Sequence, residues 1–242
     1  MASTSETGHA KNVANFYNLT SFVTGYGSTY NPTKEALMLP QLNALYASAQ
    51  TYLANVIDKN TIFNTKVNDR VAAFITLKPL ATRVLSALDA TDATPQTISD
   101  AKGFVRKLRG KSTSSPTPID PNAPAPNSIS TSQQSYDQQI QHFAGLISVA
   151  QSEATYNPNE SDLRISSLTT ILNDITAKNN EVANAYTNVS NARIERNNTL
   201  YATNTGIVEI ASEVKKYIKS VFGASSPQYA QVKGIPFRVI KT

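Results

Sequence analysis

The chain repeats part of its own sequence, and this repeat constrains the fold more than any other feature. The tripeptide Tyr30-Asn31-Pro32 recurs as Tyr156-Asn157-Pro158, and residues on either side recur in the same order. The clearest further pairs are Phe16 with Phe143, Leu37 with Leu163, Leu42 with Leu168, Arg70 with Arg196, Val84 with Ile210, and Lys102-Gly103 with Lys233-Gly234. Chance similarity rarely keeps one order along a chain, so we interpret the pattern as a tandem duplication. Its period far exceeds that of a solenoid, and we therefore expect each copy to be a whole domain.

A proline-rich stretch separates the two copies. Residues 112–131 read STSSPTPIDPNAPAPNSIST and contain five prolines. Proline lacks an N–H group and has a fixed φ angle, so this stretch is expected to be an extended, semi-rigid linker. The predicted domains are helical repeat 1 at residues 1–111, the Pro/Ser-rich linker at 112–131, and helical repeat 2 at 132–242.

The apolar residues follow the period of an α-helix in both copies. Three-and-four spacing predicts helices near residues 13–22, 42–57, 63–88 and 98–108, and equivalent helices in the second copy. Thr94-Pro95 and Ser226-Pro227 look like an N-cap followed by proline at the first helical position. Pro79 and Gly206 predict a kink or interruption. The predicted fold is all-α, a tandem pair of up-and-down four-helix-bundle-like units joined by the linker.

Four segments resemble a family of uncharacterised bacterial proteins. They are GHAKNVANF (residues 8–16), YNPTKEALML (30–39), LATRVLSALDATDAT (80–94) and VKKYIKSVFGASSPQYAQVKGI (214–235). The resemblance implies a bacterial origin and a two-copy layout over the whole chain. It implies no activity and supplies no active site.

The residues that usually carry chemistry are few. Cysteine is absent, so the chain has neither a disulfide nor a thiolate metal site. The two histidines are His9, expected in a mobile N-terminal tail, and His142, beside an apolar stripe. The sequence holds no Glu-x-x-His pair, Gly-x-Ser-x-Gly elbow or glycine-rich phosphate loop. The close carboxylates Glu160 with Asp162 and Glu209 with Glu213 are interpreted as solvated or helix N-terminal charges. We predict no catalytic residue, metal site or cofactor.

Basic clusters form the first candidate contact site. The first comprises Lys102, Arg106, Lys107, Arg109 and Lys111, and the second Lys215, Lys216 and Lys219. With a net charge of +5 they are suited to phosphate groups and predict salt-dependent binding. The competing interpretation is a helix C-terminus complemented by cations, which we favour.

The repeated Tyr-Asn-Pro loop is the second candidate contact site. Tyr30, Asn31 and Pro32 precede a helix, as do Tyr156, Asn157 and Pro158. As structure it is a turn, because the residue before proline is excluded from helical geometry. As function, two such exposed loops would present a bivalent contact. The structural interpretation is favoured.

These observations predict a non-catalytic structural or protein-interaction module with two similar helical surfaces. Its expected partner is a protein, including a second copy of itself. The alternatives are a nucleic-acid-binding protein that uses the basic segments and a small-ligand carrier or enzyme with a pocket between helices. Residues 1–12 are polar and no run of about 18 consecutive apolar residues occurs. We therefore expect no signal peptide, no membrane span and a cytoplasmic location; signal-independent export stays open.

Overall fold

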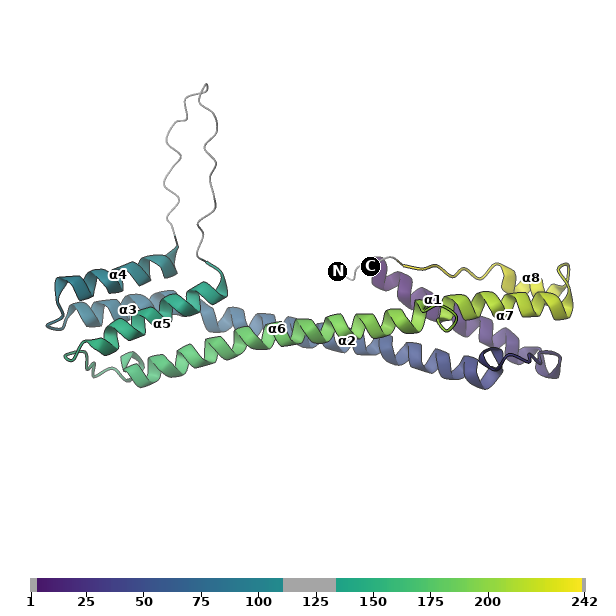
Figure 1. The fold of residues 1–242 in the computed structure, drawn as a ribbon, viewed down its shortest axis with the longest axis horizontal. Helices are drawn as coiled ribbons and strands as arrows, with labels where there is room; N and C mark the ends of the chain where they lie inside the picture. Colours follow the sequence, from purple (N-terminus) through teal and green to yellow (C-terminus); the bar gives the residue numbers. More distant parts are fainter. Residues whose placement is uncertain (1–3, 111–133, 241–242) are drawn as a thin grey trace, which may run out of the picture. The chain divides into compact units, whose positions relative to one another are not determined.

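The protein is all-helical in the computed structural model, which describes residues 4–110 and 134–240, the first four of these as backbone only. The described residues contain α-helices and short 3₁₀ helices and no strand, which confirms that the fold is all-α. The elements are α1 (Thr4–Gly25), η1 (Gly27–Thr29), η2 (Glu35–Leu37), α2 (Leu39–Ile75), α3 (Leu77–Asp89), α4 (Pro95–Arg109), α5 (Tyr136–Ser152), η3 (Ser161–Leu163), α6 (Ile165–Tyr201), α7 (Ile207–Phe222) and α8 (Pro227–Lys233) (Figure 1).

The order of elements is similar in the first half of the chain (residues 1–111) and the second (132–242). In each half a helix is followed by a 3₁₀ turn (two in the first half), a 37-residue helix and two shorter helices. The residues paired by sequence lie on matching elements. Phe16 on α1 and Phe143 on α5 are fully buried, as is Val84 on α3, while Ile210 on α7 is nearly so.

Local signals set several helix boundaries. The Thr94 and Ser226 hydroxyls accept hydrogen bonds from the N–H groups of Thr97 and Tyr229, and proline follows each cap. The predicted interruptions are also confirmed. α2 ends at Ile75, just before Pro79, and Gly206 is the N-cap of α7.

The second predicted helix of each half continues without a break into the first part of the third. We expected separate helices near residues 42–57 and 63–88, but α2 runs without a break from Leu39 to Ile75, and α6 does likewise from Ile165 to Tyr201. The physical reason is that neither helix has glycine or proline in its middle. Polar residues such as Asn60 and Asn180 lower helix propensity only slightly and do not end a helix.

The described residues form two compact units, and each unit takes helices from both halves. Unit 1 comprises residues 4–63 and 185–240, and unit 2 comprises residues 64–110 and 134–184. This division differs from the predicted domains at 1–111 and 132–242. It follows from the continuity of α2 and α6, because each of these helices begins in one unit and ends in the other. The predicted linker lies outside the described residues.

Unit 2 is a helical bundle with a mixed core. α3, α4 and α5 pack against one another, together with the end of α2 and the start of α6 (Figure 1). Its core joins Leu77, Val84 and Leu108 from the first half to Phe143 and Leu168 from the second. Burial of these side chains supplies the main force that holds the two halves together here.

Unit 1 is built in the same manner from α1, α7, α8, the start of α2 and the end of α6. Phe16 and Leu42 from the first half pack with Ile210 and Val214 from the second. An extended segment after α8 lies along α1. Asn12 holds it by donating to the carbonyl of Arg238 (2.7 Å) and accepting from the N–H of Arg238 (3.1 Å).

His9 does not lie in a mobile tail, which corrects the prediction. α1 begins at Thr4, and His9 is fully buried, with its Nδ1 atom 2.6 Å from the hydroxyl of Tyr201. The reason is spacing: His9, Val13 and Phe16 recur on one face of the helix, so the buried stripe of α1 extends further toward the N-terminus than its apolar residues alone indicate.

Candidate interaction site

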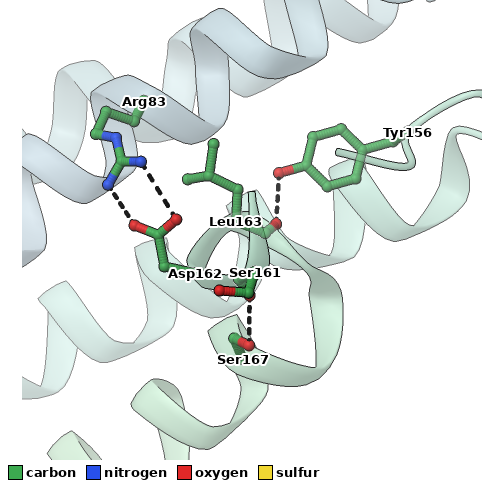
Figure 2. Close-up of polar contacts among 6 residues, drawn as sticks. All are labelled: Arg83, Tyr156, Ser161, Asp162, Leu163 and Ser167. Carbon is green, nitrogen blue, oxygen red and sulfur yellow. Dashed lines mark hydrogen bonds and ion pairs between the residues drawn. The ribbon is translucent and has the colours of Figure 1, made fainter. Parts of the chain in front are cut away.

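The two Tyr-Asn-Pro loops have the same internal structure. We call residues 30–37 loop 1 and residues 156–163 loop 2; loop 1 belongs to unit 1 and loop 2 to unit 2. The buried Tyr30 hydroxyl donates to the carbonyl of Leu37 at 2.9 Å, and Tyr156 makes the same bond to Leu163 at 2.9 Å (Figure 2). Each loop is therefore closed by a tyrosine that bonds to the end of its own 3₁₀ turn.

The backbone of the two loops agrees as well. Met38 and Arg164, which directly follow the two 3₁₀ turns, both have φ −66° and ψ 145°. Burial raises the pKa of Tyr30, and it raises the pKa of Tyr156 to about 12, so both phenols keep the proton that they donate. Asn31 and Asn157 stay exposed at the loop surface, whereas the tyrosine rings lie in the cores.

An open groove of about 790 Å³ lies between loop 2 and α3. Both walls belong to unit 2. The lining is mostly neutral and polar: Thr82, Ser86, Thr91, Asn157 and Asn159 contribute hydroxyl and amide groups. Charged groups come from Arg83, Asp92 and Glu160. Part of the floor is formed by the buried Tyr156 and Leu163. Such a lining offers hydrogen-bond donors and acceptors at the surface of unit 2.

An ion pair joins loop 2 to α3 beside this groove. Arg83 of α3 forms a two-pronged contact with the carboxylate of Asp162; the second of its hydrogen bonds measures 3.3 Å (Figure 2). The hydrogen bond from Arg83 holds the pKa of the Asp162 carboxyl below its usual value, and Asp162 raises the pKa of Arg83. Both side chains are about half exposed, so solvent screens the pair.

Loop 1 has an ion pair of the opposite polarity. Here the loop supplies the cation, Lys34, and α7 supplies the anion, Glu213, at 2.6 Å. Our sequence interpretation missed both pairs, because it treated Glu160, Asp162, Glu209 and Glu213 as charges on solvated faces. A signal was present, since the aligned halves carry opposite charges at Lys34 and Glu160, and at Arg83 and Glu209.

The basic clusters lie on helices of different units. Lys102, Arg106, Lys107 and Arg109 are exposed on α4, three of them in its last turn; Lys111 lies outside the described residues. Lys216 and Lys219 are exposed on α7, the counterpart of α3 and not of α4.

Lys215 has a structural contact. Its side chain is partly buried, donates to the carbonyl of Ile235 and lies over the Phe237 ring, and burial lowers its pKa. It therefore helps to hold the segment after α8.

Two further features concern metal binding and membrane insertion. Among the residues whose side chains are described, no three His, Asp or Glu side chains gather closely enough to hold a metal ion. One helical stretch, Leu39–Asp89, contains an 18-residue window long and apolar enough to cross a membrane, judged by length and composition alone. The same stretch contributes Leu42, Val56 and Val84 to the cores of the two units.

Comparisons with models of protein families, with curated proteins and with solved structures gave no match to this chain. The resemblance to a bacterial two-copy family therefore stays a prediction.

Proposed function

We propose that this chain is a non-catalytic protein-interaction module, formed by tandem duplication of a helical unit whose two copies exchange helices. The duplication is supported by the matching order of elements and by the identical closure of loop 1 and loop 2. The exchange is supported by the composition of the compact units, each of which takes its core from both halves.

One observation carries the interaction function: each unit presents the same rigid loop with an exposed asparagine. A loop fixed by a buried hydrogen bond loses little conformational entropy when a partner binds. Because one chain carries two such loops, a partner with two matching sites would bind with increased avidity. The polar groove beside loop 2 extends this surface with hydroxyl and amide groups. The proposed partner is a protein segment that is predominantly polar.

Photo-crosslinking in the native cell tests this function. A photoreactive residue replaces Asn31 or Asn157 in separate variants, and a third variant carries it at Asn68, an exposed position on α2. We expect Asn31 and Asn157 to yield the same protein adduct and Asn68 to yield none of it. The absence of an adduct at both loops, or equal labelling at Asn68, would contradict the proposal.

Nucleic-acid binding is a second candidate, favoured by the arrangement of α4. Lys102, Arg106 and Arg109 recur at i, i+4 and i+7 and so lie on one face, and among the described residues none of them pairs with a carboxylate. A mobility-shift titration at low salt tests it. The R106E/R109E variant is expected to lose binding, whereas K11E/K233E, with the same change in net charge, is expected to keep it.

A further inference from the structure

Each of the two loop–helix ion pairs joins one half of the chain to the other, and the loop carries the positive charge in one pair and the negative charge in the other. In unit 1, loop 1 comes from the first half and the helix that it contacts, α7, comes from the second. In unit 2, loop 2 comes from the second half and its helix, α3, from the first (Figure 2). Each loop therefore pairs with a helix of the opposite half.

The charges at corresponding positions are inverted. Lys34 and Glu160 each lie four residues after the loop tyrosine, and Arg83 and Glu209 each directly precede the matched pair Val84 and Ile210. The charge of Glu160 also raises the pKa of Arg83. Glu160 and Asp162 of loop 2 therefore interact with the same residue of α3.

The six residues Lys34, Arg83, Glu160, Asp162, Glu209 and Glu213 are called the pairing charges below. Loop 1 and α3 are positive at these positions, and loop 2 and α7 are negative. Other charges lie beside these positions: Glu35 follows Lys34 in loop 1, and Lys215 and Lys216 follow Glu213 on α7. Arg164, which follows loop 2, donates to the carbonyls of Pro158 and Asn159 within its own loop.

Pairing of a half with itself would bring like charges together. Loop 1 against α3 would place Lys34 near Arg83, and loop 2 against α7 would place four carboxylates at one junction. Such wrong pairings arise between the same halves of two copies, because a continuous 37-residue helix lies between each loop and the following helix of its own half. We propose that the pairing charges make each loop select the helix of the opposite half and reject the helix of its own half.

This inference rests on the proposed duplication, which defines the corresponding positions. Each ion pair is partly exposed to solvent and contributes little alone. Specificity, however, depends on the difference in free energy between the observed and the wrong pairings. This difference combines the attraction in both observed units with the repulsion in both wrong pairings. The apolar cores alone do not distinguish the observed from the wrong pairings, because corresponding core residues are alike. Val84 corresponds to Ile210, and Leu37 corresponds to Leu163.

The decisive experiment inverts the pairing preference in the full chain. The variant is R83E/E209K/E213K. In it, Lys34 faces a cation on α7 and Asp162 faces an anion on α3. Loop 1 then has the charge opposite to that of α3, and loop 2 has the charge opposite to that of α7. We expect this variant to pair the same halves of different copies. Its mass in low salt, from light scattering after gel filtration, is then at least twice that of the wild type.

A matched control inverts all six pairing charges: K34E/E160K/D162K/R83E/E209K/E213K. It alters α3 and α7 identically but restores complementarity between opposite halves, so we expect the mass of the wild type. Loss of folding in the three-charge variant alone also supports the inference. It is overturned if the three-charge variant keeps the mass and thermal midpoint of the wild type, or if the control departs from the wild type as strongly as the variant does. Neither result depends on an external partner, so the proposed function is tested separately.

Discussion

At the scale of single residues, the loop tyrosines combine an apolar ring in the core with a hydroxyl that closes the loop. Tyr156→Phe keeps the ring but leaves the buried carbonyl of Leu163 without its donor. We expect a loss of about 1–3 kcal/mol in the free energy of unfolding, measured by urea denaturation. Tyr30→Phe is expected to behave alike. Tyr186→Phe, at a residue 60% exposed, is the control, and an equal effect there would contradict the assigned role.

His142 is the residue for which the structure predicts a pH effect. It is buried on α5 with its Nε2 atom unpaired, and burial, followed by the charge of Lys107, lowers its pKa from 6.5. The unfolded chain therefore binds a proton first as the pH falls below about 7, and stability decreases with falling pH until the folded-state pKa is reached. The slope contributed by this one group is at most ~1.4 kcal/mol per pH unit.

The variant His142→Asn tests this effect, because Asn15 occupies the corresponding place on α1 and is also buried. We expect its urea midpoint to vary less than that of the wild type between pH 7.5 and 5.5. Parallel curves for the two proteins would show that His142 does not cause the pH dependence.

At the scale of elements, a glycine sets how closely α4 and α5 pack. A Cβ atom at Gly145 would lie 2.4 Å from the Phe104 ring, far inside van der Waals contact. We expect Gly145→Ala to destabilise the protein by about 1–3 kcal/mol, because the ring must move within a packed core. Gly103→Ala, on α4 with nothing within 4 Å, is the control and is expected to stabilise by up to ~1 kcal/mol through helix propensity. A similar sign for both would contradict the packing argument, and thermal unfolding measures both.

The sequence predicted most elements because their signals are local. Helical spacing, the Thr94 and Ser226 caps, and the interruptions near Pro79 and Gly206 each depend on residues close in the chain. The continuity of α2 was missed because neutral polar residues around Asn60 resemble a turn by composition, although helices tolerate them. The partners of Asp162 and Glu213 were missed because each lies in the opposite half, and helical periodicity carries no information on contacts at that separation.

At the scale of the whole molecule, the mixed cores predict the result of cutting the chain between its halves. A protease site engineered within residues 112–131 divides the protein into two fragments. Because both cores contain side chains from both halves, we expect the fragments to elute together from gel filtration at the mass of the uncut chain. Fragments that elute separately, each folded and with about half the mass, would show that every half forms its own domain.

The mixed composition of both cores also bears on synthesis. Each half alone would expose the apolar residues that its counterpart buries, and such surfaces aggregate. When both halves are encoded in one chain, the ribosome delivers them in a ratio of one to one and within the same round of translation. Covalent fusion thereby removes any need to match the expression of two genes, and neither half accumulates without the surface that covers it.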